Sequence, residues 1–308
     1  MSLYLAIDAG GTKTVCCVAD ETRELARVSC GTVKLMRVSE AEATDRLIGL
    51  VTEAAAVAGI SLADVTRTCM GLAGLSIAAV RSWAEKTLGK LVGGDLLLCG
   101  DEVIALDAAF EGGKGILVIA GTGSNIVGRA ADGTMYTVGG WGPALGDEGS
   151  GFWIGHEGVK AVFWGLDRGV PTTMLKAVQE AWNVDTIGDV VAAANVRPGP
   201  DFAALAPVVA WCAEEGDELA RAVLERAGDD LAEQVGLVRL KMEESGDPGN
   251  VGVAYTGSVL ERIDAVRRAM VKTLAANEVD VTVREAAVDS LDGALWRARN
   301  GALRDAKQ

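Results

Sequence analysis

The stretch Leu5-Ala-Ile-Asp-Ala-Gly-Gly-Thr-Lys-Thr14 is an apolar strand that runs into a glycine turn. The turn offers one carboxylate, from Asp8, and a run of possible phosphate donors: Gly10, Gly11, Thr12, Lys13 and Thr14. Converging backbone N–H groups in such a loop suit a phosphate group, and the carboxylate suits a metal ion. Taken alone, the stretch is a weak indication of phosphate binding, because many hairpins carry two glycines.

The same pattern occurs a second time in the chain. The first stretch aligns without a gap on Leu117-Val-Ile-Ala-Gly-Thr-Gly-Ser124, with Leu5 on Leu117 and Gly11 on Gly123. This internal repeat predicts two similar domains that face each other and clamp one polyphosphate between their loops. Only the first loop offers a carboxylate for a metal ion, because Asp8 is matched by Ala120.

Hydrophobic periodicity predicts a similar order of elements in both halves. The first half is expected to have strands at 3–8, 14–20, 24–30, 66–73 and 96–99, and helices at 39–59, 76–88 and 102–111. The second half is expected to have strands at 115–120, 125–130, 135–139, 250–256 and 279–284, and helices at 151–166, 172–182, 202–214, 217–244, 259–276 and 290–306. Ser39 and Ser76 are expected to cap the first two helices.

The predicted fold class is α/β, with two duplicated βββαβαβα domains and a cleft between them. We expect an N-terminal domain at 1–114 and a C-terminal domain at 115–308, which carries a helical insertion at 151–246. The last helix, 290–308, is able to pack back on the first domain. Parallel strands joined by helices place ligands beyond the carboxyl ends of the strands, where Gly74, Asp101 and Gly257 also stand. The cleft is therefore the expected site.

Length, charge and cysteine usage narrow the class of protein. The chain of 308 residues is long enough for two full cores. Its formal net charge of −14 argues against nucleic acid or an anionic membrane as a partner. None of its six cysteines forms a CxxC pair, which is typical of reduced core cysteines. With no N-terminal leader and no apolar run near 20 residues, a cytoplasmic protein is expected.

Together these motifs resemble the N-acetylglucosamine kinases, which are grouped with the BadF-type ATPases in the sugar kinase and actin-like ATPase superfamily. The matching stretches run over the whole chain: Ile7-Asp-Ala-Gly-Gly-Thr-Lys-Thr14, Gly71-Leu-Ala-Gly74, Gly100-Asp101, Ala120-Gly-Thr-Gly-Ser124, Gly139-Gly-Trp-Gly142, Gly146-Asp-Glu-Gly-Ser150 and Thr256-Gly-Ser258. The resemblance implies actin-like (ribonuclease H-like) domains, ATP and Mg²⁺ as cofactors, a small-molecule sugar substrate and a homodimer.

The resemblance also implies a role for each matching residue. Asp101 resembles the catalytic base, which also contacts the sugar, and Asp8 resembles the residue near the magnesium ion. The implied nucleotide-binding residues are Gly10, Gly11, Thr12, Lys13, Thr14, Gly121, Thr122, Gly123, Ser124, Gly257 and Ser258. The implied sugar-side residues are Gly74, Gly140, Trp141 and Asp147.

The chain departs from the family at Gly31-Thr-Val-Lys-Leu-Met36, where these kinases usually carry a Pro/Ser-Asn sugar contact. If Lys34 points into the cleft, it belongs to the substrate site. A lysine offers only donors and a positive charge, so it would disfavour glucosamine and favour neutral or anionic sugars. The alternative is that Lys34 lies on an exposed turn after the third strand.

Several of these residues also have purely structural interpretations. Asp101 is a favourable residue for capping the helix that follows it. The alternative for Asp147 and Glu148 is that they only order their own glycine loop. The alternative for Trp141 is that it only packs within this loop. His156, the only histidine, is expected to have a packed structural role. Four further tryptophans are expected in the core: Trp153, Trp164, Trp182 and Trp211.

The predicted function is ATP-dependent transfer of a γ-phosphoryl group to the 6-hydroxyl of an amino sugar, N-acetylglucosamine first. Asp101 would accept the hydroxyl proton, with Glu102 and Asp147 as the other candidate carboxylates. One alternative is a BadF-type ATPase that activates electron transfer and holds a cluster with cysteines. Only Cys212 follows Cys99, which argues against that alternative. A second alternative is a sugar sensor without turnover, against which the presence of Asp101 counts.

Overall fold

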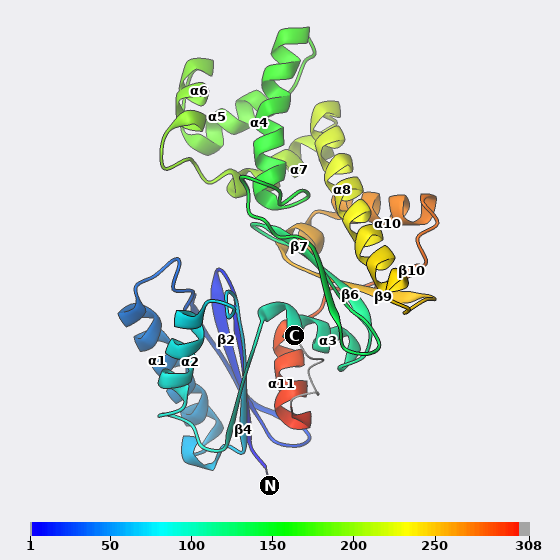
Figure 1. Ribbon diagram of the computed structural model, residues 1–308. Helices are drawn as coiled ribbons and strands as arrows, with labels where there is room; N and C mark the ends of the chain where they lie inside the picture. Colours follow the sequence, from blue (N-terminus) through cyan, green and yellow to red (C-terminus); the bar gives the residue numbers. More distant parts are fainter. Residues whose placement is uncertain (1, 302–308) are drawn as a thin grey trace. The chain divides into compact units, whose positions relative to one another are not determined.

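Two five-stranded sheets organise the computed structural model, which describes residues 2–301. The contacts within the chain divide these residues into two units. The first unit comprises the residues up to Gly115, Ala131–Thr134 and the residues from Val288 onward. The second unit comprises Ile116–Ala130 and Met135–Ala287. The predicted α/β class with a duplicated architecture is confirmed (Figure 1).

The first unit is built around β1, the central strand of a sheet with the order β3-β2-β1-β4-β5. Leu5 and Ile7 pack with α1 and α2 on one face of the sheet, and Ala6 packs with α3 and α11 on the other. Burial on both faces explains why β1 is almost continuously apolar. The elements of this unit are β1 (Tyr4–Ala9), β2 (Lys13–Ala19), β3 (Glu24–Gly31), α1 (Glu40–Ala58), η1 (Leu62–Asp64), β4 (Arg67–Leu72), α2 (Ala78–Leu88), β5 (Asp95–Cys99), α3 (Asp101–Phe110) and α11 (Ser290–Asn300).

The second sheet has the order β10-β9-β6-β7-β8, which repeats the first sheet when read from β8. β6 is therefore the counterpart of β1, as the sequence repeat predicts. Five α-helices stand between β8 and β9 as the insertion. The elements are β6 (Gly115–Ala120), β7 (Ser124–Arg129), β8 (Met135–Gly139), α4 (Gly151–Arg168), α5 (Met174–Trp182), α6 (Ile187–Asn195), η2 (Phe202–Leu205), α7 (Ala206–Glu214), α8 (Glu218–Glu244), β9 (Val251–Thr256), α9 (Ser258–Arg262), α10 (Asp264–Ala276) and β10 (Val281–Val283).

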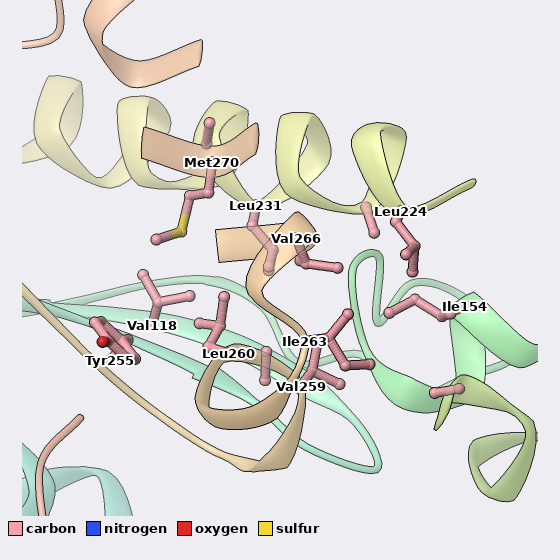
Figure 2. Packing of buried hydrophobic residues seen from close by; sticks show 14 of the residues in the cluster. Val118, Ile154, Leu224, Leu231, Tyr255, Val259, Leu260, Ile263, Val266 and Met270 are labelled. Atoms are coloured by element: carbon pink, nitrogen blue, oxygen red, sulfur yellow. The ribbon is translucent and has the colours of Figure 1, made fainter. Parts of the chain in front are cut away.

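The core of the second unit lies between its sheet and the long helix α8. Figure 2 shows Leu231 of α8 and Met270 of α10 above Val118 of β6 and Tyr255 of β9. Gly228 lets α8 and α10 approach closely, because a methyl group at this position would lie 2.5 Å from the carbonyl oxygen of Val266. The close approach of α8 and α10 lets buried side chains of both helices pack in one core with the sheet.

The structure contains one helix that the sequence interpretation missed, α6. It starts with a capping box in which Thr186 Oγ1 accepts from the Asp189 amide at 3.1 Å and the Asp189 carboxylate accepts from the Thr186 amide at 3.0 Å. Its apolar residues Ile187, Val190, Val191 and Ala194 have helical spacing, but the helix is short and Val190 is its one buried residue. Gly188 also lowers the helix propensity. The capping box was the signal that could have revealed this helix.

The single helix expected at 259–276 is two helices, α9 and α10. The chain breaks at Ile263, whose backbone has φ −110° and ψ 83° and whose side chain is buried in the core. Neither glycine nor proline marks the break, and the periodicity therefore does not show it. The helix expected at 202–214 similarly begins as the 3₁₀ turn η2 before α7.

The two predicted helix caps have different outcomes. Ser39 caps α1 as expected, with its hydroxyl accepting from the Glu42 amide at 3.2 Å, and α1 ends at Gly59 in the left-handed conformation. Ser76 does not cap α2, whose N-cap is Ile77 without a side-chain hydrogen bond.

Two of the four tryptophans expected in the core are largely outside it. Trp164 and Trp211 are 55% and 54% exposed, whereas Trp153 and Trp182 are half-buried. The apolar faces of the insertion helices are wider than the part that neighbouring elements cover. The helical periodicity of the sequence therefore predicted more buried tryptophans than the structure has.

The helix α11 packs on α3 in the first unit, although it is far away in the sequence (Figure 1). Arg297 Nε and Asp107 Oδ2 lie 2.5 Å apart, and both side chains are almost inaccessible to solvent. Gly293 allows this close approach, because a methyl group there would collide with the carbonyl oxygen of Ile104. Residues 302–308 of the predicted last helix lie outside the described residues. Among residues 2–301, no helix has both the length and the apolar character that a membrane span requires.

Arg297→Met should lower the free energy of unfolding by about 3–5 kcal/mol, because it removes the Arg297 cation from the buried Asp107 carboxylate. Urea unfolding followed by circular dichroism measures this loss. The double variant Arg297→Met with Asp107→Leu should recover most of it. Equal losses in the single and the double variant would contradict an explanation through the ion pair.

Candidate functional site

The first glycine loop connects β1 to β2 and carries Gly10, Gly11 and Thr12. The amides of Gly11 and Thr12 donate to no acceptor within the described residues, and Thr12 and Lys13 are exposed. These donors are free to bind an anion, as predicted for a phosphate loop. Thr14 differs, because it is fully buried and its hydroxyl accepts from the Val33 amide at 3.3 Å. The Thr14 side chain therefore has a structural role, and its contact with a nucleotide stays a prediction.

The segment after β3 is fastened to this loop. Thr32 Oγ1 donates to the carbonyl oxygen of Gly10 at 2.9 Å, and Arg46 Nη1 donates to the carbonyl oxygen of Thr32 at 2.7 Å. The amide of Lys34 in turn donates to Thr32 Oγ1 at 3.1 Å. The backbone of Lys34 is thus fixed relative to the first glycine loop. Lys34 is half-buried and precedes the turn at 35–37.

Asp101 is the first residue of α3 and does not cap this helix. The N-cap is Gly100, and no side chain accepts a hydrogen bond at that end. The structural interpretation of Asp101 as an N-cap is therefore wrong. Gly74, another predicted sugar-side residue of this unit, stands with φ +80° in the turn after β4.

Asp8 lies at the centre of a group of acidic residues in the first unit. The pKa of Asp8 is raised from 3.8 to about 6, first by burial and then by the charges of Asp101 and Asp289, while the charge of Lys13 opposes the rise. Asp289 was missed in the sequence. It caps α11, with Oδ1 accepting from the Leu291 amide at 3.1 Å, and α11 brings it near β1. The capping pattern was visible in the sequence, but the proximity to Asp8 depends on long-range packing.

Glu102 is the second perturbed carboxyl group of this unit. Burial raises its pKa from 4.5 to about 7, and a hydrogen bond with the Asp101 side chain and the charge of Asp101 act in the same direction. Its carboxyl group folds back over Gly100, where a methyl group would collide with it. Glu102 is thus about half protonated at pH 7, and its carboxyl group stays beside Asp101.

Asp8 fits a magnesium ion in the way that kinases use one. Among residues 2–301, no three His, Cys, Asp or Glu side chains converge to form a metal site by themselves. Mg²⁺ keeps several waters and is commonly held by one or two carboxylates together with substrate phosphates. The half-buried carboxylate of Asp8 beside a loop of free amides suits that arrangement.

The second glycine loop connects β6 to β7 and lies on the start of α4. The carbonyl oxygens of Gly121 and Thr122 accept from the amides of Gly151 and Phe152 at 2.7 and 3.2 Å. The amides of Thr122 and Gly123 donate to no acceptor in residues 2–301. Their orientation is therefore set by α4, and they are the free donors of this loop.

A long loop, residues 140–150, runs from β8 to α4 and carries Trp141. Gly140 and Gly142 have positive φ angles, and Trp141 is 75% exposed. Asp147 is only 6% exposed, and its Oδ1 accepts from the Gly142 amide at 3.1 Å. Burial raises the pKa of Asp147, and the hydrogen bond from Gly142 opposes this rise. The structure thus turns the Asp147 carboxylate toward its own loop, and its sugar contact stays a prediction.

Gly257 forms the turn after β9 and lies against the second glycine loop. Its φ is +103°, and a methyl group would collide with the carbonyl oxygen of Ala120. Its amide donates to Glu261 Oε1 at 2.8 Å, while the neighbouring Ser258 is exposed. The second unit therefore brings Gly257 and Gly121–Ser124 together at the carboxyl ends of β9 and β6.

His156 does not belong to either group of loop residues. Its ring stacks on Phe152, with centroids 6.0 Å apart, and meets Phe202 edge to face at 5.1 Å. These three aromatic side chains form a packed cluster, which agrees with the structural role expected from the sequence. The side chain is still 44% exposed, so it is packed at the surface of the helical block.

The chain belongs to the BadF/BadG/BcrA/BcrD ATPase family, whose model matches residues 5–296. It is similar to the N-acetyl-D-glucosamine kinase of Dictyostelium discoideum, with 27% identity over 318 residues, 97% of this chain and 98% of that protein. It is also similar to the N-acetylmuramic acid/N-acetylglucosamine kinase of Clostridium acetobutylicum, with 28% identity over 311 residues, 97% of this chain and 99% of that protein.

Solved structures agree with this family. A protein of Chromobacterium violaceum, described provisionally as an N-acetylglucosamine kinase, matches with a TM-score of 0.74 and 26% identity over 96% of this chain and 98% of its own. A ROK family glucokinase of Streptomyces griseus matches with a TM-score of 0.58 and 17% identity over 97% of this chain and 100% of its own, which shows the fold alone. The predicted actin-like architecture of sugar kinases is thereby confirmed.

Glu102→Gln should stabilise the ligand-free protein at pH 8 by up to about 3 kcal/mol and change little at pH 4. The folded state holds the Glu102 proton up to about pH 7, whereas the unfolded state releases it near 4.5. Between these values the folded state binds more protons, so the wild type loses stability as the pH rises, and glutamine does not.

Thermal unfolding from pH 4 to 8 measures this difference. The exposed Glu85→Gln on α2 is the matched control and should show no pH-dependent gain. A constant offset between Glu102→Gln and the wild type at every pH would show that Glu102 ionises normally.

Proposed function

We propose that this protein is an ATP-dependent kinase that transfers a γ-phosphoryl group to the 6-hydroxyl of an amino sugar, N-acetylglucosamine first. One observation carries the proposal. The two sheets have the same strand order, and in each the central strand is followed by a glycine loop with free amides. In the first unit, which contains Asp8, Asp101 is the first residue of α3. The kinases named among the relatives support the sugar class. Mg²⁺, a homodimer and a cytoplasmic location belong to the same proposal.

The residues of both units have distinct roles in this proposal. The amides of Gly11, Thr12, Thr122 and Gly123 donate to phosphate oxygens and stabilise the negative charge of the transferring group. Asp8 would hold a magnesium ion, which would neutralise further phosphate charge when bound. Asp101 accepts the proton of the sugar hydroxyl while the hydroxyl oxygen attacks the γ-phosphorus, and the bond from this phosphorus to the bridging β-phosphate oxygen breaks to release ADP. Phosphoryl transfer needs little more than this positioning and charge stabilisation.

A screen of sugars with ATP and magnesium tests the proposal by the release of ADP. N-acetylglucosamine should give turnover far above the rate without sugar. ADP release that no sugar accelerates would indicate the ATPase alternative. Sugar binding without any ADP release would indicate the sensor alternative.

Asp101→Asn should reduce kcat by roughly 10²–10⁴-fold, because it removes the positioned general base. The affinity for ATP, measured by calorimetry, should stay within a few-fold of wild type, since the amide has nearly the shape of the carboxylate. Near-normal turnover in this variant would move the role of base to another carboxylate, first to Glu102.

Lys34→Ala tests the proposed substrate contact. If Lys34 binds an anionic sugar group, its loss should cost roughly 1.5–3 kcal/mol in the specificity ratio of N-acetylmuramic acid over N-acetylglucosamine. The same variant should improve the use of glucosamine, whose ammonium group the lysine repels. Ratios that stay unchanged among these three sugars would place Lys34 outside the substrate site.

A further inference from the structure

The helical insertion contains a cavity that neither glycine loop lines. It has a volume of about 360 Å³ and lies between α4 and α6, and Phe202 of η2 also lines it. All three elements belong to the second unit, so this unit forms the cavity by itself. Binding sites for small molecules usually measure about 300–1,000 Å³, so the cavity is large enough to hold one.

Part of the cavity wall is apolar and largely aromatic. Val159 and Phe202 are buried in the packed core of the insertion, and Phe163 packs against the same core. Trp164 also lines the cavity but is 55% exposed. The Arg168 guanidinium lies 4.3 Å from the centre of the Trp164 ring and holds it by cation–π attraction. The cavity therefore presents an oriented, accessible indole ring beside an apolar floor.

Polar side chains line the rest of the cavity. Within residues 2–301, the carboxylate of Asp167 takes part in no hydrogen bond or ion pair, so its oxygens are free acceptors. Asn195 Nδ2 donates to the carbonyl oxygen of Val191 at 2.8 Å, which leaves Oδ1 of Asn195 as a further acceptor. Lys160 supplies donors, although its ammonium group also pairs with Glu157 at 2.5 Å. The cavity thus offers both donors and acceptors next to its aromatic wall.

The charges around the cavity favour a neutral ligand. Among the residues that line it, Lys160 and Asp167 carry one charge of each sign. An anionic ligand would meet the Asp167 carboxylate and would compete with Glu157 for Lys160. A cationic ligand would meet the Lys160 ammonium group. Like charges at short range disfavour both ligands, whereas a neutral ligand with several hydroxyl groups is able to bond to both side chains.

We propose that this cavity is a binding site for a neutral carbohydrate. A pyranose ring has C–H groups on its faces and hydroxyl groups around its edge. The C–H groups would pack on the Trp164 ring and on Phe202. The hydroxyl groups, which both donate and accept, would bond to Asp167, Asn195 and Lys160. The site is formed without either glycine loop, so this inference goes beyond the proposed kinase activity and does not depend on it.

Fluorine NMR of the protein labelled with fluorotryptophan tests the proposal at Trp164 itself. The probes are methyl β-glucoside, N-acetylglucosamine and N,N′-diacetylchitobiose, and the Trp164 resonance is identified by its absence in Trp164→Phe. At least one probe should shift this resonance in a saturable way, with a Kd of about 1 mM or below. The absence of a saturable shift with all of these probes would overturn the proposal.

Trp211 provides a matched control within the same protein. It is 54% exposed and belongs to the same insertion, but it does not line the cavity. Its resonance, identified with Trp211→Phe, should not move when a probe shifts that of Trp164. Equal shifts of the two resonances would indicate nonspecific contact of sugar with exposed indole rings, which contradicts a defined site.

Asp167→Ala and Asn195→Ala test the hydrogen bonds. Both side chains are exposed, so both variants should keep the fold. Asp167→Ala should weaken the binding that the Trp164 resonance reports by roughly 10-fold or more, the usual loss for a hydrogen bond to a charged group, and Asn195→Ala by a smaller factor. Glu180→Ala removes an exposed carboxylate of α5 that does not line the cavity, and should bind as wild type. Wild-type affinity in both cavity variants would refute the proposed contacts.

Charged and aromatic probes test the chemical class of the ligand. Glucuronic acid and glucosamine should shift the Trp164 resonance only at higher concentrations than the neutral sugars. Adenosine should leave this resonance in place. Tighter binding of a charged sugar, or a shift with adenosine alone, would show that the cavity takes another class of ligand and that the proposal is wrong.

The Trp141 resonance distinguishes this inference from the proposed kinase function. A shift of Trp141 without a shift of Trp164 would mean that sugar binds only at loop 140–150, which overturns the inference and leaves the proposed function intact. A saturable shift of Trp164 in a protein that phosphorylates no sugar would support the inference and contradict the proposed function.

Discussion

The structure depends on how the central strands β1 and β6 end. Each strand is buried within its sheet, and each must leave the core through a turn tight enough for a neighbouring strand to begin within a few residues. Glycine makes such a turn possible, and the turn leaves amides without partners. In the first loop Thr32 holds the carbonyl oxygen of Gly10, and in the second α4 holds those of Gly121 and Thr122. The carbonyl oxygens are satisfied by protein, so the free amides are what remains to bind an anion.

The first unit also contains a group of carboxylates, which attract cations, whereas the free amides of the glycine loops attract anions. The protein has a formal net charge of −14, and Asp8 lies near two further aspartates while Glu102 lies beside Asp101. Burial, and then the neighbouring carboxylates, raise the pKa values of Asp8 and Glu102, so their charged forms are unfavourable in the ligand-free protein. A cation bound there would relieve part of this cost, which links the stability of this unit to its occupancy. Titratable groups with strongly perturbed pKa values cluster at functional sites.

Much of this architecture could be predicted from the sequence, because it follows from local patterns. The repeated strand and glycine turn indicated the two sheets, and Ser39 and Gly59 indicated the ends of α1. The break at Ile263 and the exposed Trp164 could not be predicted, since both depend on which surfaces the surrounding helices cover. In the candidate site, too, the contacts between distant segments could not be predicted from the sequence. Its backbone loops were predicted, but the use of Thr14 and Asp147 as internal braces depends on contacts with distant segments.

The return of α11 to the first unit has a consequence for how the chain folds during synthesis. The face of the first sheet that carries Ala6, Cys17 and Cys69 is covered by α3 together with α11. This face therefore lacks part of its cover until residues 290–300 have left the ribosome, whereas the second unit has its sheet and α8 by about residue 283. The N-terminal unit, although synthesised first, therefore completes its core after the second unit, and one face of its sheet stays partly uncovered until α11 packs on it.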